Sequence, residues 1–254
     1  MNDRIKKLRE QSIDAVNRIS RERAVLVTEF YKSDAARQVS TPVKRAMAFK
    51  YILDNKAISI ADGELIVGER GPAPKATSTY PEVCIHTIKD LETLDSREKV
   101  SFSVDDETKK VYEEEIIPSW KGRSMRDRIF SEVPPEWQAA YEAGLFTEFQ
   151  EQRAPGHTVL GDKIYRKGFL DLKREIAGSI ENIDFFADPE ALDKREELEA
   201  MDIAADALIG FAGRHAARLD ELAKNEDNPE RKKELEKMAE ICRRVPAHAP
   251  GTFH

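Results

Sequence analysis

The sequence has 254 residues, of which 40% are hydrophobic, so it can bury the core of one large domain or of two small ones. Its 48 acidic and 41 basic residues give a formal charge of −7 and are spread along the chain. This distribution argues against a nucleic-acid-binding protein, which would concentrate basic residues on one face. No apolar run approaches the length that crosses a bilayer, so we expect no membrane partner.

The two cysteines, Cys84 and Cys242, are far apart and fit neither a zinc spacing nor a disulfide framework. Cys84 and His86 are a conceivable metal pair, but no third ligand is near, and alternation with Val83 and Ile85 favours a half-buried strand. We therefore expect no metal site. Because no basic-then-apolar leader is present, the simplest expectation is a reducing cytoplasm in which both thiols stay free.

Helical periodicity dominates the N-terminal part of the chain. Apolar residues recur at helical spacing over residues 3–17, Ser20 can cap a second helix that reaches Tyr31, and Thr41-Pro42 begins a third. We expect these three helices to pack antiparallel, with their apolar stripes in the core.

The pattern changes after the third helix. Asp62-Gly63 indicates a turn, Leu65-Ile66-Val67 a short β-like run, and residues 70–81 a proline-rich loop. The loop lacks the glycine spacing that cradles a phosphate, which argues against nucleotide binding.

Helices return in the second half of the chain. They are expected over residues 105–117 up to Pro118, Pro134-Pro135 to Gly144, Gly168 to Ile183, Asp188-Pro189 to Lys224, and Asn228-Pro229 to Arg244. The sequence then stops in a Pro-Gly segment with an aromatic residue and two histidines, which is typical of a connection to a further element.

The stretch from Phe149 to Gly168 differs from the helical sequence around it. Pro155 cannot continue a helix and Gly156 permits unusual backbone angles, so His157 should lie on a kink that can aim its side chain into a cleft. Physical chemistry alone slightly favours a plain turn whose histidine caps a backbone carbonyl. An aromatic residue such as Phe149 is by default part of a core.

This stretch also carries a resemblance. Arg-Ala-Pro-Gly-His-Thr-Val at 153–159 and Lys-Ile-Tyr-Arg-Lys-Gly at 163–168 look like the N-terminal region of glycyl radical enzymes related to pyruvate formate-lyase, and most like the trans-4-hydroxy-L-proline dehydratases among them. Further matches follow in order along essentially the whole chain: Glu-Arg-Ala-Val-Leu at 22–26, Asp-Gly-Glu-Leu-Ile-Val-Gly-Glu at 62–69, Tyr-Pro-Glu at 80–82, Glu-Glu-Ile-Ile-Pro at 114–118 and Pro-Glu-Trp-Gln-Ala-Ala-Tyr-Glu-Ala-Gly at 135–144.

The resemblance implies a mainly α fold. Residues 1–254 would be the helical N-terminal part of a pyruvate formate-lyase (PFL) domain, which stops before the catalytic cysteine and the C-terminal glycyl radical domain, with most of the ten-stranded α/β barrel absent. Such enzymes carry a glycyl radical, installed by a radical S-adenosylmethionine activating enzyme, and they commonly form homodimers. The cysteine motif Gly-Cys-x-Glu and the glycine motif Arg-Val-x-Gly-Tyr are both missing here. This chain alone is therefore expected to bind no cofactor and to be catalytically silent.

The resemblance also implies the site residues. In hydroxyproline dehydratases the aromatic residue equivalent to Phe149 packs on the substrate ring, and the histidine equivalent to His157 lines the pocket near the substrate's polar groups. An apolar wall suits a ring, and a hydrogen bond or proton given to a leaving hydroxyl eases its loss. His157 is thus the candidate catalytic and substrate-binding residue and Phe149 a candidate substrate-binding wall. Arg153 and Lys163 could hold a carboxylate, although solvated charges explain them better.

Two classes of function remain open on the sequence. The chain is either part of a lyase, most simply a hydroxyproline dehydratase, or a stand-alone helical scaffold or interaction module without catalysis. Other glycyl radical enzymes remain alternatives for the first class: glycerol or diol dehydratase, isethionate sulfite-lyase, or formate C-acetyltransferase (pyruvate formate-lyase itself). Exposed apolar faces would favour the first class, because a selected stand-alone protein rarely leaves a large apolar patch in water.

Overall fold

The structure is a computed structural model that describes residues 2–146 and 161–252. The described chain is mainly helical and has two short strands. In chain order its elements are α1 (Asp3–Asp14), β1 (Arg18–Ser20), α2 (Glu22–Lys32), η1 (Ala35–Arg37), α3 (Thr41–Asn55), β2 (Ala76–Ser78), α4 (Ile88–Ser96), α5 (Asp106–Val111), the π-helix η2 (Tyr112–Ile116), α6 (Ile117–Trp120), α7 (Met125–Glu132), α8 (Pro135–Glu142), η3 (Gly161–Tyr165), α9 (Phe169–Glu181), α10 (Ala191–Lys224) and α11 (Pro229–Arg244).

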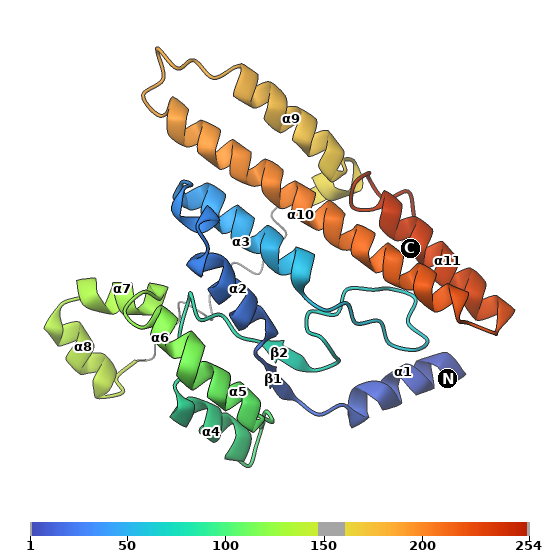
Figure 1. Cartoon of the computed structure of the whole chain (residues 1–254), viewed down its shortest axis with the longest axis horizontal. Helices are drawn as coiled ribbons and strands as arrows, with labels where there is room; N and C mark the ends of the chain where they lie inside the picture. Colours follow the sequence, from blue (N-terminus) through green and yellow to red (C-terminus); the bar gives the residue numbers. More distant parts are fainter. Residues whose placement is uncertain (1, 147–160, 253–254) are drawn as a thin grey trace.

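Helix α10 organises one half of the molecule. Its 34 residues span about 50 Å at 1.5 Å per residue. Helices α3, α9 and α11 all pack along it (Figure 1). Small buried residues on α10, among them Ala200, Ala205 and Ala216, let the neighbouring helices approach closely. At the α3 contact, Val43 and Ala46 form a buried cluster with Ala200.

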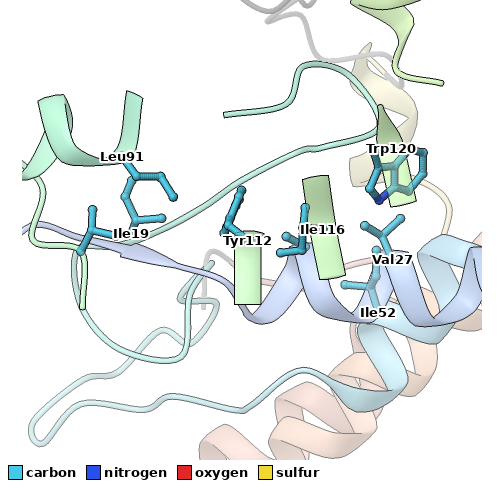
Figure 2. Packing of buried hydrophobic residues seen from close by; sticks show 9 residues of the cluster. Ile19, Val27, Ile52, Leu91, Tyr112, Ile116 and Trp120 are labelled. Carbon is cyan, nitrogen blue, oxygen red and sulfur yellow. The ribbon is translucent and has the colours of Figure 1, made fainter. Parts of the chain in front are cut away.

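A second core lies between α2, α4 and the continuous helical run from α5 to α6. Tyr112, Ile116 and Leu91 are fully buried there, together with Val27 of α2 and Trp120 of α6 (Figure 2). Each large apolar side chain buried in this way contributes about 1.5–3 kcal/mol. This core holds the first half of the chain together independently of the long α10 contacts.

The two strands lie where the sequence predicts none. β1 pairs in parallel with β2, with Arg18 opposite Ala76. β1 lies in the link between the first two helices, and β2 lies within the proline-rich segment that was expected to be a loop. The strand expected at residues 65–67 is absent: Ile66 is 66% exposed, and only Val67 packs inward, against the α10–α11 core. The strand expected around Cys84 is likewise a turn, because the amides of Val83 and Cys84 both donate to the Tyr80 carbonyl (2.9 and 3.0 Å).

Pro118 does not end its helix, which corrects the sequence prediction. The turn before it widens into the π-helix η2, in which the Ile117 amide donates to the Tyr112 carbonyl five residues back. Pro118 then lies in the first turn of α6, where a missing N–H costs little. The helical run therefore reaches Trp120, whose side chain packs in the core.

The expected trio of N-terminal helices is also wrong in part. Helices α2 and α3 pack together, but α1 has no buried residue and lies apart from them, near the segment around Asp62 and near α11 (Figure 1). Arg4 of α1 pairs with Glu234 of α11 at 2.6 Å, and Lys7 pairs with Asp62. Ion pairs thus replace the expected apolar packing of α1.

Other helix limits follow the sequence closely. Helix α3 begins at Thr41 with Pro42 in its first turn, and α8 begins at Pro135. The Asn228 side chain caps α11 by accepting from the amides of Glu230 and Arg231, at 2.9 and 3.2 Å. Within the described residues, no helix is both long enough and apolar enough to span a bilayer.

Candidate functional site

The two residues predicted to form the site, Phe149 and His157, lie outside the described residues, as does Arg153. The roles predicted for Phe149 and His157 therefore stay predictions. The structure describes both flanks of this stretch: the α7–α8 hairpin with Phe146 before it, and η3 with the start of α9 after it. The geometry that follows is that of these two flanks.

The upstream flank is an aromatic cluster around Arg126. The Trp137 ring centroid lies 4.7 Å from that of Phe146 and 5.4 Å from that of Phe130, and Phe130 and Tyr141 are 5.0 Å apart, edge to face. The Arg126 guanidinium lies 4.1 Å above Phe130 and donates to the Tyr141 hydroxyl at 3.3 Å. Aromatic pairs of this kind contribute about 0.5–1.5 kcal/mol beyond area burial. The cluster therefore holds Phe146, three residues before Phe149.

This hairpin is tied to the rest of the fold through its first turn. Ser124 and Asp127 form a capping box: the Ser124 hydroxyl accepts from the Asp127 amide at 3.1 Å, and the Asp127 carboxylate accepts from the Ser124 amide at 3.3 Å. The amides of Met125 and Arg126 donate to the carbonyls of Glu82 and Val83, at 2.9 and 3.0 Å. The aromatic cluster is thus anchored to the Tyr-Pro-Glu motif.

The downstream flank is rich in charge. Lys163 is exposed on η3, Arg166 pairs with Asp162 at 2.9 Å, and Lys167 pairs with Glu175 of α9. Exposed pairs of this kind contribute about 0.2–1 kcal/mol. Arg166 and Lys167 thus satisfy their charge on the surface, whereas the interpretation of Arg153 and Lys163 as solvated charges stays a prediction.

Three of the motifs that carry the family resemblance meet in the first-half core. Arg23 of the 22–26 motif holds Glu82 of the 80–82 motif with two hydrogen bonds, of 2.5 and 3.1 Å, and also donates to the Thr79 carbonyl at 3.2 Å. Its guanidinium covers the Tyr80 ring at 3.9 Å. Ile116 of the 114–118 motif is fully buried in the cluster that also contains Ala24 of the 22–26 motif. These motifs therefore build the scaffold rather than a catalytic centre.

Tyr112 completes this buried network. Its hydroxyl donates to the Thr79 hydroxyl, and burial raises the pKa of Tyr112 to about 12. The Trp120 indole donates to the Thr28 hydroxyl at 2.8 Å, which in turn donates to the Ala24 carbonyl at 2.6 Å. Because these polar groups are paired inside the core, they fix the orientation of the aromatic side chains.

A cluster of basic residues lies where α10 crosses the end of α3, and it was not predicted from the sequence. Arg214 donates to the carbonyls of Leu53 and Lys56 at 2.5 and 2.7 Å, which satisfies the C-terminal carbonyls of α3. Burial lowers the pKa of Lys56, whose ammonium donates to the Arg70 carbonyl at 2.6 Å. Apart from the adjacency of Arg214 and His215, nothing in the sequence signals that these groups meet.

His215 is the most enclosed member of this cluster, with 3% of its surface exposed. Its Nδ1 lies 3.0 Å from the Phe211 carbonyl, and its Nε2 has no hydrogen-bond partner within the described chain. Burial, and to a lesser extent the charges of Lys56 and Arg214, lower the pKa of His215. The imidazole is therefore neutral at pH 7, with Nδ1 donating to the carbonyl.

The Cys242 thiol is not activated. Burial raises the pKa of the Cys242 thiol, which packs against the α10–α11 core, and such a thiol is a poor nucleophile. Cys84 and His86 are half-buried on a turn, and no group of three potential metal ligands occurs in residues 2–146 and 161–252.

Comparison with known proteins connects this scaffold to a family. The family described as Pyruvate formate lyase-like matches residues 1–254. The trans-4-hydroxy-L-proline dehydratase of Clostridioides difficile is 52% identical over 252 residues, which cover 99% of this chain and 32% of that protein. An isethionate sulfite-lyase of Nitratidesulfovibrio vulgaris is 33% identical and covers 93% of this chain, and the match takes up 30% of its own length.

Solved structures agree. The crystal structure of the hydroxyproline dehydratase from Clostridioides difficile with trans-4-hydroxy-L-proline bound covers 100% of this chain with a TM-score of 0.94, at 52% identity and over 32% of its own length. The glycerol-bound, B12-independent glycerol dehydratase from Clostridium butyricum gives a TM-score of 0.91 at 28% identity, again over 100% of this chain and 32% of its own. The chain thus spans about a third of the length of these relatives. It belongs to the pyruvate formate lyase-like family and matches the N-terminal portion of its glycyl radical enzymes.

Proposed function

We propose that this chain forms part of a glycyl radical dehydratase that acts on trans-4-hydroxy-L-proline, and that it contributes one wall of the substrate pocket. The observation that carries the proposal is the 52% identity to a hydroxyproline dehydratase over 99% of the chain. The isethionate sulfite-lyases are 27–33% identical, and the glycerol and 1,2-propanediol dehydratases are 28% and 30% identical. The matched scaffold is therefore more like that of the hydroxyproline enzyme than like those alternatives.

In this proposal the site residues keep the roles that the resemblance implies. Phe149 forms an apolar wall against the substrate ring, and His157 hydrogen bonds to, or protonates, the hydroxyl that leaves. The radical, when installed by an activating enzyme of the radical S-adenosylmethionine class, supplies the hydrogen abstraction that precedes this loss. The assembly is a cytoplasmic homodimer, as is common in the family.

Exposed apolar side chains support the assignment to a larger enzyme over a stand-alone scaffold. Phe185 and Phe186, in the turn between α9 and α10, are exposed, and so are Leu192 and Met201 on α10. Leaving several large apolar side chains in water on one helical hairpin is unfavourable for a protein that works alone. The stand-alone alternative predicts a native gene product of 28.9 kDa, the mass of this chain, and an intact-mass measurement on the source cells decides between the two.

The activity itself is tested on the intact gene product that contains these residues. After anaerobic activation, it should consume trans-4-hydroxy-L-proline with loss of one water, and much faster than glycerol, 1,2-propanediol or isethionate. An enzyme that carries the radical, yet turns over one of those compounds instead, would refute the substrate.

His157→Ala tests the role of the histidine. Turnover per glycyl radical should fall by about 10²–10⁴-fold, the usual contribution of a positioned acid or base, whereas the amount of radical should change little. The matched control is Arg128→Ala on α7, where the side chain is 80% exposed and removal should leave turnover unchanged. Equal loss of turnover and radical would make His157 a structural residue, and no loss would remove it from the site.

A further inference from the structure

The turn between α9 and α10 displays large apolar side chains at one end of the molecule. It joins the last turn of α9 to the first turn of α10 and lies at the outer end of that helical hairpin (Figure 1). Phe186 is fully exposed, and Phe185 and Leu192 are 51% and 57% exposed. We call residues 181–199, which carry these three side chains, the hairpin tip.

Hydrogen bonds hold the turn of the hairpin tip in place. The Asp184 carboxylate accepts from the amides of Phe186 and Ala187 at 2.9 and 3.0 Å. The Asp188 amide donates to the Asp184 carbonyl at 3.0 Å, and its carboxylate accepts from the Glu190 amide at 2.9 Å. A side chain on a preorganised turn loses little conformational entropy when a partner surface covers it. Phe186 is therefore suited to fill an apolar pocket on such a surface.

The hairpin tip also carries almost all of the net charge of the chain. It contains eight acidic and two basic residues, which give a net charge of −6, whereas the rest of the chain contains 40 acidic and 39 basic residues. The two basic residues, Lys194 and Arg195, already pair with carboxylates of the same segment. Three exposed acidic side chains have no ion pair or side-chain hydrogen bond within residues 2–146 and 161–252: Glu181, Asp193 and Glu197.

This charge distinguishes between possible occupants of the apolar surface. Two hairpin tips facing each other would bring six net negative charges against six, so like-charge repulsion opposes a dimer through this surface. The negative surface of an anionic lipid bilayer is opposed for the same reason. The occupant should instead offer an apolar pocket surrounded by a surplus of lysine and arginine.

The length of the relatives indicates where such a surface is found. This chain matches 32% of the length of the hydroxyproline dehydratase of Clostridioides difficile, so about two thirds of that protein lies outside the match. A surface within the same polypeptide is present at a high effective concentration, so it needs little intrinsic affinity to cover the hairpin tip.

We propose that the hairpin tip docks onto the part of the intact polypeptide that follows residue 254, at a positively charged surface with an apolar pocket for Phe186. This inference rests on the proposed function, which makes the chain about a third of a longer enzyme. The docked tip joins the N-terminal helices to the rest of the enzyme at the end of the hairpin that is farthest from the α9–α11 contact.

Photo-cross-linking from the hairpin tip of the intact gene product tests the proposal. Phe186→p-benzoylphenylalanine replaces one fully exposed ring by another, so the substitution should leave the fold unchanged. After irradiation, denaturing electrophoresis separates cross-links within one polypeptide, which keep its mass, from cross-links between copies, which double it. Mass spectrometry of the digested protein then identifies the peptide that has reacted.

The proposal predicts a cross-link within one polypeptide, to a peptide beyond residue 254 that carries a net positive charge. A product of doubled mass would assign the surface to a second copy and overturn the proposal. A cross-link only to residues 1–254, or a probe that reacts with no peptide, would overturn it as well.

A charge reversal tests the electrostatic part of the proposal. Glu197→Lys, in the protein that carries the photo-reactive residue, should lower the yield of the cross-link beyond residue 254 because it places a positive charge against a positive surface. The matched control is Glu236→Lys on α11, since Glu236 is also exposed and has no ion pair within the described chain. Equal yields in the two lysine variants would overturn the assigned charge of the docking surface and the proposal with it.

The cross-linking needs no radical, so it separates failure of the docking from failure of the proposed function. An intact protein that cross-links as expected, but after activation leaves trans-4-hydroxy-L-proline unchanged, would refute the substrate alone. An enzyme that dehydrates hydroxyproline without this cross-link would refute the docking alone. A native gene product of 28.9 kDa would refute both, and its intact mass is measured first.

Discussion

Replacing Glu82 by glutamine should destabilise the protein, because Glu82 and Arg23 join two segments of the first-half core. The side chains of Arg23 and Glu82 are 20% and 24% exposed, so the pair is neither fully buried nor freely solvated. A hydrogen bond to a charged group contributes about 1.5–3 kcal/mol, and an exposed ion pair about 0.2–1 kcal/mol. Glu82→Gln removes the charge and turns one acceptor into a donor that faces the guanidinium. We therefore expect the free energy of unfolding to fall by about 2 kcal/mol.

For a protein of this size, about 2 kcal/mol corresponds to a fall in Tm of about 4–8 °C, measurable by circular dichroism or calorimetry. The control is Asp54→Asn, which breaks the Lys50–Asp54 pair at 2.7 Å on α3, where the side chains are 42% and 40% exposed. This exposed pair should contribute less than about 0.5 kcal/mol. Equal shifts in Tm for Glu82→Gln and Asp54→Asn would refute the reasoning that the Arg23–Glu82 pair supports the core.

Two further predictions concern backbone packing and pH. Gly71→Ala places a Cβ 2.2 Å from the Ala76 carbonyl oxygen at the start of β2, so the free energy of unfolding, measured by chemical denaturation, should fall by about 1–3 kcal/mol. Gly213→Ala on α10, where an added Cβ meets nothing within 4 Å, should raise it by up to about 1 kcal/mol. A loss of equal size in both variants would contradict this prediction. Burial lowers the pKa of His215 below the value of about 6.5 in an unfolded chain, so the unfolded state binds more protons. The stability from neutral His215 is therefore complete above pH 6.5 and is lost as the pH falls through the lower, folded-state pKa. The free energy of unfolding should decline less between pH 7 and pH 5 in His215→Leu, and an unchanged slope would show that another group is responsible.

Local signals in the sequence predicted most of the helices. Proline in the first turn marks the start of α3 at Pro42, of α8 at Pro135 and of α11 at Pro229, because its fixed φ and missing N–H suit that turn alone. The expectation that Pro118 ends its helix failed, because the preceding turn widens into a π-helix and the chain continues helical with Pro118 in the first turn of α6. Tertiary packing decides that outcome: stopping the helix there would leave Trp120 outside the core.

The two strands could not be predicted from local sequence. Each has three residues, and β1 is paired with β2 across more than fifty positions, so the pairing depends on contacts that no short window contains. The close passage of Gly71 over Ala76 belongs to the same arrangement. Conversely, Leu65-Ile66-Val67 has strand composition, yet no strand of the described chain is available to pair with it, and it remains irregular.

The candidate site was predicted only through the family resemblance, and the structure describes only the segments before and after it in the chain. The basic cluster of Lys56, Arg214 and His215 and the close backbone contact of Gly168 with Ala247 and His248 both bring together residues far apart in the sequence, and neither has a periodic or motif signal. Such groups become visible only when the chain is folded.

The way in which the matched motifs fold explains what the similarity can and cannot say about substrate. Arg23 and Glu82, from two of the motifs, form a partly buried ion pair, and Ile116 of a third motif packs in the same core as Ala24, so these motifs build the scaffold. A scaffold of this kind superposes on relatives named for hydroxyproline and for glycerol with TM-scores of 0.94 and 0.91, a difference too small to separate two substrates. The choice of substrate must therefore come from side chains that face the pocket, and within this chain the candidates are Phe149 and His157. Activity measurements on variants of those two residues, rather than closer comparison of the fold, are what can separate a hydroxyproline dehydratase from a diol dehydratase.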